Sequence, residues 1–164
     1  MTIRFGLLTL SDRSARGERV DASGPALAHL VLAQNWSVIE QAILADDEST
    51  IRAALTAWAD SGRFDVILTT GGTGFALRDV TPEATRAIIQ RDAPGLAEAM
   101  RADSLKKTPH AMLSRGIAGI RGRTLIVNLP GSPKGAVENL QTILPVLPHA
   151  VQLLNDDPNS EASH

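Results

Sequence analysis

The sequence predicts one α/β domain: a three-layer sandwich in which helices cover both faces of a mostly parallel central sheet that has one antiparallel edge. Two observations carry this prediction. Short apolar runs alternate along the chain with helical patterns of about 10–15 residues, which is typical of parallel sheets. In the last third of the chain, two strand-like runs are separated only by Gly122-Arg123, which predicts a hairpin and therefore the antiparallel edge.

The first elements are a strand, a long loop and a helix. Residues 3–10 form a nearly unbroken apolar run, as in a strand that is covered on both faces. The polar segment 11–21 predicts a loop. Ser23 as a cap and Pro25 in the first turn predict a helix that ends near Asn35.

Two further strands, each followed by a helix, occupy the middle of the chain. Residues 38–44 predict a strand, and the acids at 46–48 favour the positive end of a helix that stops at Gly62. Residues 65–70 predict the third strand, and the segment 81–83 (Thr-Pro-Glu) predicts the start of the next helix.

The last third of the chain is predicted to contain two more helical segments and the hairpin. A Pro-Gly pair at 94–95 precedes a helical pattern that runs to about Lys106. The hairpin strands cover 115–121 and 124–129, and Ser-Pro at 132–133 begins a helix that later prolines divide.

Composition limits the classes of protein to consider. At 164 residues the chain fits a single domain, predicted over 1–155, followed by a disordered polar tail over 156–164. With 43% apolar residues and a net charge of −2, no basic field attracts nucleic acid, and no run approaches the ~20 apolar residues of a membrane span. The N-terminus lacks a signal-peptide pattern, so we expect a cytoplasmic protein.

The segment TTGGTG at 69–74 directly follows the third predicted strand. Its three glycines remove the side chains that would keep an anion from the backbone N–H groups, and its threonines add hydroxyl donors. The turn therefore predicts a cradle for phosphate, although a turn that only reverses the chain remains an alternative. The usual nucleotide-binding patterns, GxxxxGK[ST] and GxGxxG, are absent.

Two carboxylates belong to the same set of loops. Asp79 follows the glycine turn and Asp46 follows the second strand, so a divalent cation such as Mg²⁺ would relieve their repulsion beside a bound phosphate. Alternatively, Asp46 caps the next helix and Asp79 pairs with Arg78. Lys134, at the start of a later helix, offers charge to an anion or is simply solvated.

Four segments resemble the MogA/MoaB family of molybdenum-cofactor biosynthesis: SDRSARGERVDASG (11–24), TTGGTGFALRDVTPEAT (69–85), LSRGIAGI (113–120) and NLPGSPKG (128–135). They lie in the order and spacing of the family and span nearly the whole chain. The amino-acid sequence of the second segment is more similar to the MogA type, the molybdopterin adenylyltransferases, than to the MoaB type.

The resemblance implies a homotrimer that transfers AMP from MgATP to molybdopterin, releases pyrophosphate and passes its product to a molybdenum-insertion protein. It assigns catalysis and Mg²⁺ binding to Asp79 and Asp46, and a shift of one residue would replace Asp46 by Asp47. Residues 71–74 and Ser132 would hold the nucleotide, and residues 11–12 with the last loop would line the pterin side. The substrate-binding residues implied are Ser11, Asp12, Thr70, Gly71, Gly72, Thr73, Gly74, Asn128, Pro130, Gly131, Ser132 and Lys134.

Two other functions stay open at this point. One is a MoaB-like trimer that binds the pterin or serves as a scaffold without turnover. The other is nucleotide hydrolysis, because similar folds are fused to proteins of the CinA type.

Overall fold

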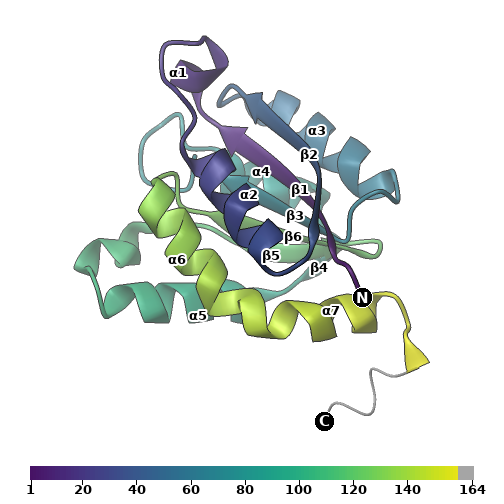
Figure 1. Ribbon diagram of the computed structural model, residues 1–164. Helices are drawn as coiled ribbons and strands as arrows, with labels where there is room; N and C mark the ends of the chain where they lie inside the picture. The colour runs from purple at the N-terminus through teal and green to yellow at the C-terminus, as the bar shows by residue number, and fades with distance from the viewer. Residues whose placement is uncertain (159–164) are drawn as a thin grey trace.

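The computed structural model describes residues 1–158 and places a six-stranded sheet between two layers of helices (Figure 1). The strands are β1 (Arg4–Leu10), β2 (Ser37–Leu44), β3 (Val66–Thr70), β4 (Arg91–Asp92), β5 (Ala118–Arg121) and β6 (Thr124–Leu129). Their order in the sheet is β2-β1-β3-β6-β5-β4, in which the first four pair in parallel and the last two form an antiparallel edge. The predicted fold class is therefore confirmed.

The helices divide between the two faces of the sheet. They are α1 (Asp12–Ala15), α2 (Ser23–Ala33), α3 (Glu48–Asp60), α4 (Thr81–Ile88), α5 (Pro94–Leu105), α6 (Pro133–Ile143) and α7 (Leu147–Leu154), with 3₁₀ turns η1 (Pro109–Leu113) and η2 (Leu144–Val146). Helices α2, α5, α6 and α7 cover the face nearer the viewer in Figure 1, and α3 and α4 cover the other.

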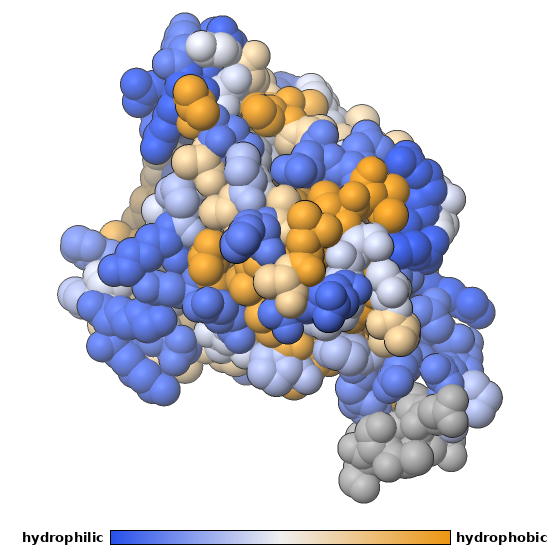
Figure 2. All heavy atoms as spheres, in the orientation of Figure 1, coloured by the Kyte–Doolittle hydropathy of each residue, from blue (hydrophilic) through white to orange (hydrophobic). Residues whose placement is uncertain are grey.

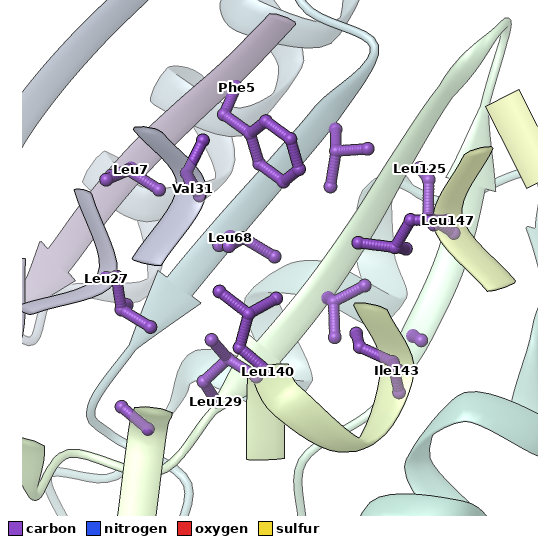
Figure 3. Close-up of a cluster of buried hydrophobic side chains, with 14 of the residues drawn as sticks. Phe5, Leu7, Leu27, Val31, Leu68, Leu125, Leu129, Leu140, Ile143 and Leu147 are labelled. Carbon is purple, nitrogen blue, oxygen red and sulfur yellow. The ribbon is translucent and has the colours of Figure 1, made fainter. Parts of the chain in front are cut away.

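Strand β1 explains why both faces need helices. Phe5 and Leu7 lie in the larger core with side chains from α2 and α6 (Figure 3), whereas Leu8 and Leu10 lie in the smaller core with α3 and α4. Successive side chains of a strand point to opposite faces, so an unbroken apolar run requires a cover on each. The prediction of a fully covered strand is confirmed.

The start of α2 differs from the prediction. Ser23 is the first residue of the helix rather than its cap, and the Asp21 carboxylate accepts hydrogen bonds from the N–H groups of Ser23 (3.1 Å) and Gly24 (3.1 Å). The Ser23 hydroxyl instead donates to the carbonyl of Gly131 at 2.7 Å. This bond ties the start of α2 to the loop after β6.

The hairpin is shorter than predicted. Strand β5 begins at Ala118 rather than at 115, and the two-residue β4, which the sequence did not predict, pairs with it as an additional edge strand. Arg115 does not join the sheet because its N–H donates to the carbonyl of Thr73 at 2.8 Å. The segment before β5 is thereby held against the glycine turn.

The outer edges of the fold carry two more features. Strand β2 lies at the edge of the sheet and leaves Ile39 and Ile43 exposed, and Figure 2 shows a band of apolar side chains across this view of the molecule.

After α7, the N–H groups of Asp156 and Asp157 donate to carbonyls of that helix, and residues 159–164 of the predicted tail lie outside the described residues. Within residues 1–158, no helix has the length and apolar character needed to cross a membrane.

Candidate active site

A cavity of about 380 Å³ opens where the loops after β1, β2, β3 and β6 meet. These loops follow the carboxyl ends of parallel strands, which is the edge where open α/β sheets bind ligands. Its lining includes these predicted site residues: Ser11, Asp12, Asp46, Thr70, Gly71, Gly72, Asp79, Gly131 and Ser132. The four loops that the sequence analysis placed at this edge therefore line one cavity.

A second cavity, of about 300 Å³, lies on the other side of the glycine turn. Thr73, Gly74 and Pro130 line it, together with side chains from α5, η1 and α6. Ser132 lines both cavities, so the start of α6 is a wall that the two cavities share. The hydroxyl of Ser132 caps that helix by accepting the N–H of Gly135 at 3.1 Å.

Asp46 faces the first cavity through a reciprocal contact with Asp12. The Asp12 N–H donates to Oδ2 of Asp46 at 3.1 Å, and the Asp46 N–H donates to Oδ1 of Asp12 at 2.8 Å. The other oxygen of Asp46, Oδ1, is buried and accepts no hydrogen bond from the described residues. Burial raises the pKa of this carboxyl, and repulsion from Asp12 and Asp79 adds to the rise, against the hydrogen bond from Asp12 and the charge of Arg78.

The neighbouring Asp47 has a different role. Its carboxylate caps α3 by accepting the N–H of Thr50 at 2.9 Å and the Thr50 hydroxyl at 2.6 Å. The alternative in which Asp46 caps this helix is therefore wrong. Asp46, and not Asp47, lines the cavity.

Asp79 reaches the same cavity from the end of an exposed loop. Its Oδ2 accepts the N–H of Ala76 at 3.0 Å, and its own N–H donates to the carbonyl of Ala76 at 2.9 Å. Arg78 also lines the cavity but forms no ion pair with Asp79 among the described residues. The pairing considered as an alternative is thus absent from this part of the chain.

The glycines of the turn allow close approach of the chain to itself. A Cβ on Gly71, whose φ is +103°, would lie 2.3 Å from the carbonyl oxygen of Leu10, and one on Gly74 would lie 2.9 Å from Oδ2 of Asp79. The N–H of Gly71 donates to the carbonyl of Leu129 at 3.2 Å, whereas residues 72–74 donate no backbone hydrogen bond to acceptors within residues 1–158. These three N–H groups are thus without an acceptor among the described residues.

Two predicted binding residues do not line either cavity. Asn128 is buried, and its amide donates to the hydroxyls of Thr69 (3.0 Å) and Thr85 (3.0 Å) and accepts the N–H of Ile117 at 3.2 Å. It joins strands and helix instead of contacting a ligand. The Lys134 side chain is 88% exposed beside Glu138, because its position in the first turn of α6 directs it to solvent.

Sequence reasoning missed three arginines of the site. Arg13, Arg19 and Arg78 line the first cavity, and none forms an ion pair with a carboxylate of residues 1–158. They line a space that is also lined by four aspartates, Asp12, Asp21, Asp46 and Asp79, so the cavity offers partners to both a cation and an anion. The clustering of arginines in the loop after the first strand was the available signal.

Comparison with known proteins identifies the family of this chain. Residues 6–149 match the family model described as "Probable molybdopterin binding domain". This chain belongs to that family. The predicted resemblance is confirmed.

Individual members of the family extend the comparison. A molybdopterin adenylyltransferase of Helicobacter pylori (strain J99) is 43% identical over 155 residues, which are 93% of this chain and 88% of that protein. The molybdopterin biosynthesis enzyme MoaB of Thermus thermophilus has a TM-score of 0.90 at 52% identity, and the match covers 96% of this chain and 99% of that one. The names of these two relatives therefore divide between the two types.

Some relatives are much longer than this chain. The molybdenum cofactor synthesis protein cinnamon of Drosophila melanogaster is 48% identical over 158 residues, which are 95% of this chain but 26% of that protein. The chain likewise spans 23% of gephyrin of Dictyostelium discoideum.

The residues of the first cavity fit a magnesium ion. Oδ1 of Asp46 is a buried carboxylate oxygen without a hydrogen-bond donor, which is costly unless a cation completes it. Residues 1–158 contain no group of three or more histidines and acids placed to hold an ion. Mg²⁺ characteristically binds through one or two carboxylates together with substrate phosphates, so Asp46 and Asp79 match its preference.

Proposed function

We propose that this protein transfers AMP from MgATP to molybdopterin with release of pyrophosphate. The observation that carries the proposal is the pair of carboxylates, Asp46 and Asp79, in one cavity with a glycine turn and three arginines. The Helicobacter pylori relative, 43% identical over 93% of this chain, carries the name of this activity.

The proposed reaction is a direct displacement at phosphorus that requires no covalent enzyme intermediate. A phosphate oxygen of molybdopterin attacks the α-phosphorus of ATP, the bond to the β-phosphate oxygen breaks, and pyrophosphate leaves. Such transfers require alignment and charge stabilisation rather than a protein nucleophile. Asp46 and Asp79 would hold Mg²⁺, which would supply positive charge to the phosphates.

The two cavities suit the two substrates differently. Arg13, Arg19 and the N–H of Gly72 favour the triphosphate in the first cavity, where Asp12 and Ser11 also lie. The second cavity has a more apolar lining with donors such as Arg101 and suits a fused ring, so we assign it to the pterin. This moves residues 11–12 to the nucleotide side and residues 73–74 to the pterin side, contrary to the expectation from the resemblance.

Ser132, which lines both cavities, lies where the two phosphates would meet. Its hydroxyl and the N-terminus of α6 favour an anion at that point. The carbonyls of Pro130 and Gly131, just before Ser132, accept hydrogen bonds from the hydroxyls of Thr70 (2.6 Å) and Ser23 (2.7 Å), which hold this loop in place. The boundary between the cavities is therefore the proposed place of transfer.

We also propose a cytoplasmic homotrimer that passes its product to a molybdenum-insertion protein. The exposed apolar residues Ile39 and Ile43 on the edge strand β2 are surface that a subunit contact would cover. Sedimentation equilibrium of the purified protein tests the assembly, and a monomer at micromolar concentration contradicts it.

The decisive experiment measures pyrophosphate released by purified protein from molybdopterin and MgATP. Asp79→Asn and Asp46→Asn should each lower the rate about 100-fold or more, since each removes a carboxylate that would hold the metal ion beside the phosphates. Asp47→Asn is the matched control, because it changes the adjacent acid outside the cavity, and it should retain the wild-type rate. Near-normal turnover of either cavity variant would contradict the mechanism.

Two further measurements separate the alternatives. Binding of molybdopterin in a titration calorimeter, with no pyrophosphate upon addition of MgATP, would favour a scaffold without turnover. Nucleotide breakdown in the absence of any pterin would favour hydrolysis.

A further inference from the structure

Arg115 makes an unusual set of contacts outside both cavities. Its Nε donates to the carbonyl of Gly74 at 2.7 Å, and its Nη2 donates to the carbonyl of Asp79 at 2.7 Å. The remaining donors of the guanidinium face the carboxylate of Glu83 in the first turn of α4. One planar group therefore joins both ends of the loop that carries Asp79 to the helix that follows.

That loop has little else to hold it. All four residues at 75–78 are exposed, so no packed side chain supports the loop. Within it, the Asp79 carboxylate is oriented by the N–H of Ala76, and the Asp79 N–H returns to the carbonyl of Ala76. The orientation of the carboxylate thus depends on the shape of the loop backbone, which depends on the separation of residues 74 and 79.

Thr81 holds the beginning of the glycine turn, at residues 71–72. Its N–H donates to the carbonyl of Gly72 at 3.2 Å and its hydroxyl donates to the carbonyl of Gly71 at 2.9 Å. These bonds hold the base of the turn but do not reach residues 74–79. Hydrogen bonds from a charged group are among the strong ones, so the two bonds from Arg115 carry much of the remaining constraint.

We propose that Arg115 is a positioning residue that sets the place of the Asp79 carboxylate in the first cavity. Its effect on turnover rests on the proposed adenylyl transfer, whereas its effect on the loop does not. The neighbouring Ser114 lines the second cavity, so the segment that borders the proposed pterin site also holds the acid of the nucleotide site. Arg115 itself touches neither substrate.

The test compares Arg115→Met and Arg115→Lys with a matched control, Arg121→Met. Arg121 also joins a carboxylate and a backbone carbonyl, donating to Asp60 (2.9 Å) and to the carbonyl of Ile88 (2.9 Å), but it lies away from both cavities. Thermal unfolding first establishes that each variant is folded.

The first readout is amide hydrogen exchange without ligands. In Arg115→Met, exchange at Ala76 and Asp79 should accelerate by about tenfold or more, and Arg115→Lys should recover part of the protection because an ammonium still donates. Arg121→Met should leave these amides unchanged. Wild-type protection in both Arg115 variants would overturn the proposal.

The second readout is the dependence of pyrophosphate release on Mg²⁺. In Arg115→Met, the Mg²⁺ concentration for half-maximal rate should rise about tenfold, while the KM for molybdopterin changes less than about twofold, since the pterin contacts remain. A rise in the molybdopterin KM alone would overturn the positioning role. If the wild type releases no pyrophosphate, the proposed function fails, and hydrogen exchange still decides the role of Arg115.

Discussion

Replacement of Gly72 by alanine tests whether the glycine turn is required for close packing beside the acids. Gly72 has a φ of +68°, and a Cβ there would lie 2.3 Å from Oγ1 of Thr81 and 3.3 Å from Oδ1 of Asp46. Gly62 has a nearly equal φ of +72° and no atom within 4 Å of such a Cβ. An alanine would thus carry the same backbone strain at either position, and the two positions differ only in the atoms that surround the added Cβ.

The magnitudes follow from these contacts. Alanine in the left-handed region costs about 1–2 kcal/mol, which is the whole expected effect of Gly62→Ala. Gly72→Ala must also displace the buried Thr81 hydroxyl, whose bond to the carbonyl of Gly71 is 2.9 Å long. Losing this bond adds about 1–3 kcal/mol, for a total of about 2–5 kcal/mol.

Urea unfolding at neutral pH without metal measures the free energy of unfolding of both variants. Gly72→Ala should be the less stable by about 1–3 kcal/mol and should bind Mg²⁺ with nucleotide more weakly, because the added methyl group crowds Asp46. Equal losses of stability in the two variants would refute the argument from close approach and leave only backbone strain.

Three other predictions concern the acids and the metal. Asp46→Asn keeps the acceptor for the Asp12 N–H but removes the ionisable group. Because burial raises the pKa of Asp46 in the folded protein, the wild type is stabilised by the protonated carboxyl at low pH and loses this stabilisation as pH rises through that pKa. Thermal unfolding without metal should therefore show the variant gaining stability relative to the wild type above about pH 4, and parallel pH profiles of the two proteins would contradict this. Asp47→Ala should lower the free energy of unfolding by about 1 kcal/mol through loss of the α3 cap, as urea unfolding would show, while pyrophosphate release stays within about twofold of wild type. Removal of Mg²⁺ with a chelator should abolish pyrophosphate release and restoration of the ion should recover it, whereas turnover that persists in the chelator would exclude the proposed role of Asp46 and Asp79.

The architecture was largely predictable from local patterns. The unbroken apolar run at 3–10 requires cover on both faces, and the glycine-rich turn after the third strand marks the edge where ligands bind. The exact start of α2 was not predictable in this way, because a serine at 23 and an aspartate at 21 are both able to accept N–H groups of the first turn, and only the path of the folded backbone selects between them. Such patterns depend on neighbours within a few residues.

The tertiary structure decided which side chains belong to the site. Asp46 and Asp47 are adjacent acids, but the extended backbone at Asp47 turns its carboxylate to α3 while Asp46 meets Asp12 from the neighbouring loop. Asn128 satisfies buried hydroxyls, and Arg115 reaches a loop 41 residues earlier in the chain. These directions arise from contacts between distant segments, so sequence by itself supplied the residue types and the folded chain determined which of them face the cavity.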